Sequence, residues 1–144
     1  MYGALDISTS GMVAQRIRLE VASANLANSS TLFDESGRLN PYQRRFAVFA
    51  PGNPQSGTAG GKDFGVQVKA ILTDRQTPPN VREYNEDSPL AYKDGPFKGY
   101  VAETNVNSVE ENINALEAMR AYEANVMAAE ATKQMISSSL RLLA

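Results

Sequence analysis

Three glutamates near the C-terminus are the residues whose type and spacing come nearest to acid–base chemistry. Glu117, Glu123 and Glu130 lie six and seven positions apart, and paired carboxylates can act as general acid and base. Charges at this spacing on a long helix usually form a solvated stripe or pair with a neighbouring helix. The chain has no histidine and no cysteine, which removes imidazole bases, thiolate nucleophiles and the usual zinc ligands. We therefore expect no enzyme activity, no metal and no cofactor.

Two further motifs resemble anion-binding sites. The stretch "GTAGGKD", residues 57–63, is like a phosphate-binding loop, but three residues instead of four separate its outer glycines. It also has Asp63 where a serine or threonine should hold magnesium, so it predicts a flexible loop. Arg44 and Arg45 could contact a phosphate or a carboxylate of a neighbouring subunit. A solvated strand edge, which such charges protect from unwanted pairing, explains the two arginines equally well.

Length and charge set the broad class of the protein. The 144 residues, 42% of them hydrophobic, suffice for one compact core. Fourteen basic and sixteen acidic residues are interspersed along the chain, so no basic face predicts binding to nucleic acid or to anionic lipid. The first fifteen residues lack the charged and apolar regions of a cleaved secretory signal, and no stretch reaches the roughly 18 apolar residues of a membrane span. We expect no small-molecule substrate either.

The first thirty residues carry the pattern of a long helix that packs on two sides. The pattern predicts a helix that begins between residues 3 and 10 and ends near Asn28. One set of positions steps by three and four, the spacing of a heptad seam: Leu5, Ser8, Met12, Gln15, Leu19, Ala22 and Leu26. A second set falls roughly 100 to 180° around the helix axis: Val13, Ile17, Val21 and Ala24.

The last forty residues repeat this organisation. Asn107 followed by Glu110 predicts a capping box, and Glu111 adds negative charge in the first turn, where the helix dipole favours it. One seam follows the same spacing: Met119, Tyr122, Val126, Ala129, Lys133, Ile136, Leu140 and Leu143. A second face is made mostly of small residues: Ala118, Ala124, Ala128, Ala131, Met135 and Leu142. Because little other chain remains to cover two faces on each helix, we expect the helices to pack in an assembly.

The segment between the helices differs sharply in composition. Residues 29–106 hold all seven prolines and eight of the ten glycines. Two stretches predict strands, "PYQRRFAVFA" (41–50) and "FGVQVKAIL" (64–72), and a third element is expected within residues 81–101, with a turn at Asp94-Gly95. The middle is thus a small β-rich insert.

Helix length predicts the overall shape. A helix from Asn107 to Leu143 is about 55 Å long, whereas a compact chain of this size has a radius of gyration of about 14 to 15 Å. We expect a mainly α, elongated molecule whose terminal helices pair as a coiled coil, with the β insert at one end. Residues 1–30 and 105–144 form a discontinuous helical domain in this interpretation, and 31–104 form the insert, with a flexible loop at 51–63.

Two signatures in the sequence resemble a known family. "ANLANSST" (24–31), which follows the first heptad helix, is similar to the N-terminal signature of bacterial flagellar rod and hook proteins. "NVNSVEENINALEAMRAYEANV" (105–126) is similar to their C-terminal signature. Within that group, "PYQRRFAVF", "DRQTPPNVREY" and "ATKQMISSSLRLL" resemble the short proximal rod proteins. The likeness covers nearly the whole chain.

The resemblance implies a structural subunit of the proximal rod of the flagellar basal body, which polymerises into the helical drive shaft needed for motility. The implied partners are other rod proteins, copies of the same chain and the ring–rod junction protein. The implied location is the rod, which spans the periplasm. The flagellar type III apparatus would export the chain unfolded, without a cleaved signal peptide.

The residues expected to form the assembly interface are the helix seams and the asparagines at the helix end: Leu5, Met12, Leu19, Asn25, Leu26, Asn28, Met119, Tyr122, Asn125, Val126, Ala129, Ile136 and Leu140. Asn25 and Asn28 can also satisfy backbone groups where the first helix ends, since asparagine tolerates the left-handed backbone of many helix termini. Ordinary exposed capping is the alternative interpretation of both asparagines.

A second functional hypothesis is a soluble coiled-coil adaptor or export chaperone for flagellar components. Self-association distinguishes the two hypotheses, because a chaperone forms a small defined complex whereas a rod subunit joins an open helical array.

Overall fold

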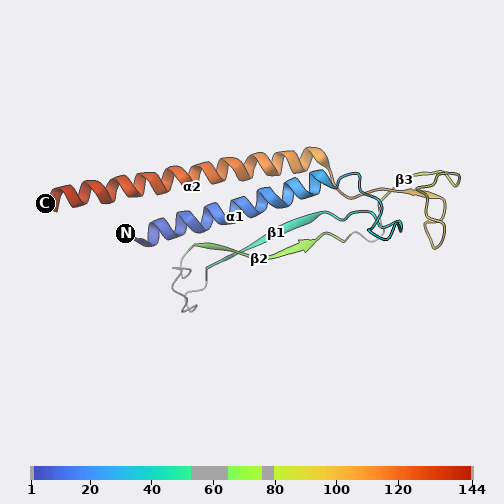
Figure 1. Cartoon of the computed structure of the whole chain (residues 1–144), viewed down its shortest axis with the longest axis horizontal. Helices are drawn as coiled ribbons and strands as arrows, with labels where there is room; N and C mark the ends of the chain where they lie inside the picture. The colour runs from blue at the N-terminus through green and yellow to red at the C-terminus, as the bar shows by residue number, and fades with distance from the viewer. Residues whose placement is uncertain (1, 53–64, 76–79, 144) are drawn as a thin grey trace.

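The computed structural model describes residues 2–52, 65–75 and 80–143. Its elements are α1 (Tyr2–Ala27), β1 (Arg45–Pro51), β2 (Val66–Thr73), β3 (Val81–Tyr84), β4 (Tyr100–Ala102) and α2 (Ser108–Leu143). The molecule is elongated, with two long antiparallel helices side by side, both chain ends at one end and β3 with β4 at the other (Figure 1). The predicted long terminal helices and small β-rich segment are confirmed. The "GTAGGKD" stretch, and the predicted flexible loop from residue 53 on, lie outside the described residues.

The first helix ends one residue before the predicted position. The backbone N–H of Asn28 donates to the carbonyl of Ala24 at 3.1 Å, and the Asn28 side-chain amide donates to the same carbonyl at 2.9 Å. Asn28 therefore satisfies a backbone group at the helix end, as predicted. The left-handed backbone predicted for the asparagines is wrong, since among the described residues only glycines have positive φ.

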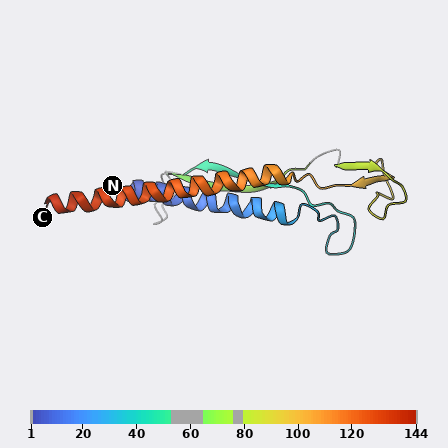
Figure 2. The ribbon, with the colours of Figure 1, turned by 90° about the horizontal axis from the view of Figure 1, so that it is seen from above.

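The second helix is capped by Asn107, as the sequence predicted. The Asn107 Oδ1 accepts from the backbone N–H groups of Val109 at 3.0 Å and Glu110 at 3.4 Å, which satisfies donors that lack partners within the helix. The second bond of the predicted capping box, from the Asn107 backbone N–H to the Glu110 carboxylate, is wrong, because this carboxylate forms a 3.0 Å ion pair with Arg44 instead. Both views show α2 extending past the N-terminal end of α1 (Figures 1 and 2).

Small and polar residues bring α1 and α2 together. Gly11 approaches the Asn125 side chain so closely that an added Cβ would lie 2.8 Å from its nitrogen. Ala22 is buried on α1 and Ala118 on α2, and small side chains at these positions allow the backbones to approach. Part of the predicted seam is displaced by one residue: Gly11 faces α2, while its neighbour Met12 is only half-buried to one side.

The antiparallel hairpin of β1 and β2 lies along α1, which separates it from α2 in Figure 1. Phe46 pairs with Leu72, and the register shifts between Val48 and Phe49. The Ser10 hydroxyl of α1 accepts from the backbone N–H of Val66 at 3.1 Å. The predicted position of the whole insert at one end is therefore wrong for this hairpin, which covers part of the second face of α1.

The second β pair forms the far end of the molecule. β3 pairs with β4 in antiparallel fashion, and the rings of Tyr84 and Tyr100 meet edge to face, with centroids 5.3 Å apart. Gly99 has a φ of 82°, and an added Cβ there would lie 2.5 Å from the Tyr84 ring. The turn predicted at Asp94-Gly95 is displaced: the chain bends at these two residues, and the hydrogen-bonded turn follows them, with the Lys98 N–H donating to the Gly95 carbonyl at 3.3 Å.

The close approach at Gly11 predicts the effect of a bulky side chain there. Gly11→Leu should lower the free energy of unfolding by about 1–3 kcal/mol, because overpacking forces the helices apart. Gly3→Leu is the matched control, since no atom lies within 4 Å of a Cβ at Gly3. Thermal unfolding followed by circular dichroism measures both. Equal stability of the two variants would contradict the packing at Gly11.

Candidate functional site

A buried polar cluster joins the two helices to the hairpin; we call it the polar junction, and its members are Asn25, Tyr42, Arg44, Asn105 and Glu111. Asn25 is 0% exposed and Glu111 2% exposed. They are the largest fully buried side chains among the described residues. A buried carboxylate is stable only when it is paired and hydrogen-bonded, so its partners determine how these segments meet.

Glu111 is paired on both of its oxygens. Its Oε1 lies 2.6 Å from Nε of Arg44, and its Oε2 accepts from the Asn25 side-chain amide at 2.9 Å. Arg44 also pairs with the more exposed carboxylate of Glu110 at 3.0 Å. Burial alone would lower the pKa of Arg44, but the hydrogen bond and charge of Glu111 raise that pKa above its ordinary value. The guanidinium therefore stays charged inside the junction.

Asn25 connects α1 to the start of β1. Its amide nitrogen donates to the Arg45 carbonyl at 2.7 Å, and its oxygen accepts from the Arg45 N–H at 2.9 Å and from the Tyr42 hydroxyl at 3.1 Å. One side chain thus satisfies both backbone groups of Arg45, as a neighbouring strand would. All of these partners belong to the same chain, and the side chain has no exposed surface. The interface role of Asn25 stays a prediction.

Asn105 fixes the entry to α2. Its oxygen accepts from the Arg44 N–H at 2.6 Å, and its amide donates to the Asp74 carbonyl at 2.7 Å. Asp74 follows β2, and its own N–H donates to the Arg44 carbonyl at 2.7 Å. The junction therefore ties together α1, both strands of the hairpin and the start of α2.

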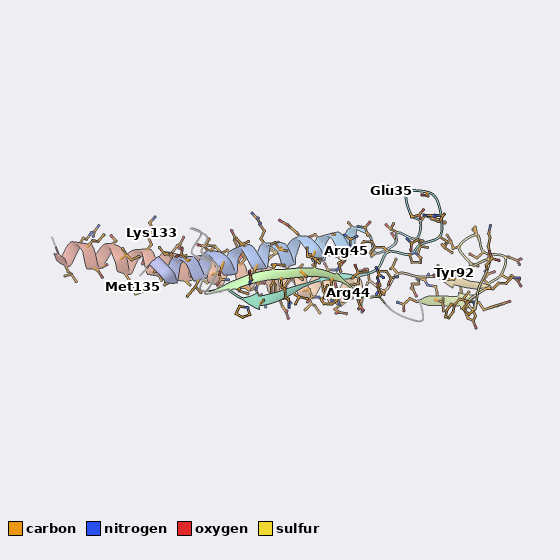
Figure 3. All side chains as sticks on the ribbon, turned by 90° about the horizontal axis from the view of Figure 1, so that it is seen from below. Glu35, Arg44, Arg45, Tyr92, Lys133 and Met135 are labelled. Atoms are coloured by element: carbon orange, nitrogen blue, oxygen red, sulfur yellow. The ribbon has the colours of Figure 1, made fainter. Side chains whose placement is uncertain are left out.

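The two arginines predicted to contact a neighbouring subunit differ in their surroundings. Arg44 is engaged inside the chain by Glu110 and Glu111, and its contact with a neighbouring subunit stays a prediction. Arg45 is exposed on the hairpin, with its guanidinium 5.6 Å from the centre of the Tyr42 ring. Figure 3 shows the two arginines together at one end of the hairpin, while Lys133 and Met135 lie toward the far end of α2.

Seven of the residues predicted as an interface lie together in the structure. We call this set the shared apolar face: Leu5, Met12, Leu19, Leu26, Met119, Tyr122 and Val126. With Gly11 and Glu111 taken as the positions that point at the partner helix, the α1 members lie roughly 60–120° and the α2 members roughly 20–80° around their axes. Because the two helices are antiparallel, similar angles around their axes point to the same side of the pair, so all seven residues lie on one side. Ser10, which holds the hairpin, lies on the other side.

The members of the shared apolar face are only partly covered. The α1 members are half-buried, as is Val126, whereas Met119 is 47% exposed and Tyr122 40% exposed. Of the remaining predicted residues, Leu140 is exposed on α2 beyond the shared face, and four are half-buried: Asn28, Asn125, Ala129 and Ile136. Asn125 faces Gly11 within the chain.

Sequence reasoning missed the central ion pair of the polar junction and left one apolar row outside the predicted seam. The pairing of Arg44 with Glu111 gave no local signal, because a glutamate in a first helical turn already has an explanation in the helix dipole. A second exposed apolar row on α2 contains Val109, Ile113 and Leu116. Their three- and four-residue spacing was a signal that the predicted seam did not include.

The residues that the structure describes contain no group of three or more acidic residues placed to hold a metal ion. Within the same residues, neither helix is long and apolar enough to cross a membrane.

Comparison with known proteins matches both ends of the chain. Residues 5–32 match the family model "Flagella basal body rod protein", and residues 98–142 match "Flagellar basal body rod FlgEFG protein C-terminal". The flagellar basal-body rod protein FlgC of Borreliella burgdorferi is 35% identical, over 99% of this chain and 97% of its own. FlgC of Bacillus subtilis is 32% identical over 98% and 97%, and FlgC of Escherichia coli 36% identical over 95% and 93%.

The two carboxylates on Arg44 provide a matched test of the polar junction. Glu111→Gln should lower the free energy of unfolding by about 2–4 kcal/mol, because it leaves the guanidinium without its buried counter-charge. Glu110→Gln removes an exposed partner of the same arginine and should cost less than about 1 kcal/mol. Chemical denaturation measures both variants. Similar losses for the two would show that Glu111 does not hold the junction.

Proposed function

The chain belongs to the flagellar basal-body rod protein family and is a structural subunit of the proximal rod, and from this premise we propose that it enters the rod through the exposed sides of its helix pair. The family is one of structural rod proteins, which is not an enzyme class. Membership implies a place in the basal body and assembly with other rod components and with itself.

The observation that carries the proposal is the kind of side chain that the subunit buries. Among the described residues, the fully buried hydrophobic residues are all alanines: Ala14, Ala22, Ala91, Ala102 and Ala118. Large apolar side chains such as Met119 and Tyr122 are exposed on the helices. Burying such a side chain contributes about 1.5–3 kcal/mol, so contact with neighbouring subunits supplies much of the hydrophobic stabilisation that one chain lacks.

The two parts of the chain have different tasks in this proposal. Residues 1–30 and 105–144 form the discontinuous helical domain, paired as a coiled coil, that packs in the wall of the rod. Residues 31–104 form the β-rich insert. The polar junction lies where the two parts meet, and it holds the β1–β2 hairpin on one side of the pair while the shared apolar face stays open on the other.

Export and the outer contacts of the rod belong to the same proposal. A subunit whose buried hydrophobic residues are alanines costs little to unfold, which suits passage through the flagellar type III apparatus without a cleaved signal. The ring–rod junction protein is a further partner, and the assembled rod spans the periplasm.

A charge placed on the shared apolar face tests the proposal. Leu19→Glu or Val126→Glu should abolish swimming and rod formation, because each places a carboxylate where a neighbouring subunit packs. Motility, secretion of the subunit and fractionated basal bodies are measured together. Thr9→Glu and Ser138→Glu are matched controls, since both positions are exposed and polar on the same helices and lie at roughly 160° and 180°, away from the shared apolar face. Normal rods in cells with either of the first two variants would contradict the proposal.

A further inference from the structure

A second apolar surface on α2 points away from α1. We call it the outer row: Val109, Ile113, Leu116 and Met127, which are 68%, 52%, 55% and 64% exposed. With Glu111 taken as the position that faces α1, these residues lie roughly 140–200° around the helix axis. Among the described residues no other element covers them, since each stays more than half exposed, so a partner that covers them comes from outside the subunit.

The outer row fits the shared apolar face in length and shape. The row extends from Val109 to Met127, about 27 Å at 1.5 Å per residue, and the α1 side of the shared face extends from Leu5 to Leu26, about 31 Å. Spacings of three and four residues form the ridges that pack between two neighbouring helices. The shared apolar face offers such a position, because it has a row of apolar side chains from α1 on one side and from α2 on the other.

Charges on the two surfaces are complementary. The exposed Arg120 lies within the outer row, between Leu116 and Met127. Along the α2 edge of the shared apolar face, at roughly 100–120°, lie the exposed carboxylates of Glu123 and Glu130. When the outer row of one copy lies on this face of another copy, the arginine of the first comes near the two carboxylates of the second. Each copy carries both kinds of charge, so the same pairing recurs at every contact.

We propose that adjacent copies of this chain contact one another heterologously, with the outer row of one copy packed on the shared apolar face of the next. The inference rests on the proposed function and names the two surfaces that assembly uses. On α2 the two surfaces are about 110° apart, so one subunit can bind two neighbours at once. A contact between different surfaces builds rings or open helical arrays, whereas a contact of one surface with itself stops at a dimer.

Cysteine cross-linking tests this contact, because the natural chain contains no cysteine. Ile113→Cys is combined in one chain with Met12→Cys, Leu19→Cys or Leu26→Cys, which sample the length of the shared apolar face. Ile113 points away from α1, so a cross-link must join two copies. Isolated basal bodies from swimming cells are treated with a mild oxidant or a short bis-maleimide, and the products are separated without reductant.

The expected result is a ladder of dimers, trimers and larger products for at least one pair, several-fold stronger than for Ile113→Cys combined with Lys69→Cys on the exposed hairpin. Products no stronger than this control for all three pairs would overturn the inference. Dimers alone from the single variant Ile113→Cys would overturn it too, since they would show two outer rows in contact.

Charge reversal gives a second, independent measurement. Arg120→Glu should reduce swimming several-fold, and Glu123→Lys or Glu130→Lys in the same chain should restore much of it. Absence of rescue by both would count against the inference. These outcomes differ from failure of the proposed function, which would appear as normal rods in cells with Leu19→Glu. If cells with Leu19→Glu lose their rods but cross-linking stays at the background level, the proposed function stands. Only the contact between these two surfaces is then overturned.

Discussion

The structure depends on one buried carboxylate. Glu111 has almost no exposed surface, and a charge in that position is stable only because Arg44 and Asn25 both bind it. Arg44 belongs to the segment that enters the hairpin, and Asn25 belongs to the last turns of α1. The need to pair one charge therefore brings three distant parts of the sequence to a single point, and it sets the register in which the two helices run.

The same arrangement explains why the large apolar side chains remain on the outside. Gly11, Ala22 and Ala118 line the contact between the helices, so the helices approach closely and leave no room there for leucine or methionine. The larger residues lie beside the contact or opposite it. A subunit built in this way has a definite shape but a small hydrophobic core, and the proposed packing in the rod would cover its apolar surfaces.

Periodicity was sufficient to predict both helices, because each carries a long pattern and Asn107 marks the start of the second. The strands were predicted from alternation and from turn residues, but the position of the β1–β2 hairpin was not, since it is set by the bonds of Asn25 and Asn105 to backbone groups far away in sequence. The heptad seam was displaced for a similar reason. A pattern that counts apolar residues favours Leu19 and Met12 at the contact, whereas close packing and charge pairing place Gly11 and Asn25 there.

If the polar junction holds α1, the hairpin and the start of α2 as one cooperative unit, loss of one member should loosen all three. Amide hydrogen exchange in the intact subunit measures this, with the wild-type chain compared to Asn25→Ala. This single change in α1 should deprotect the amides of Arg44 and Arg45 and those of the first turn of α2 together, because units that open cooperatively exchange together. Faster exchange confined to the end of α1, with the hairpin and α2 unchanged, would contradict it.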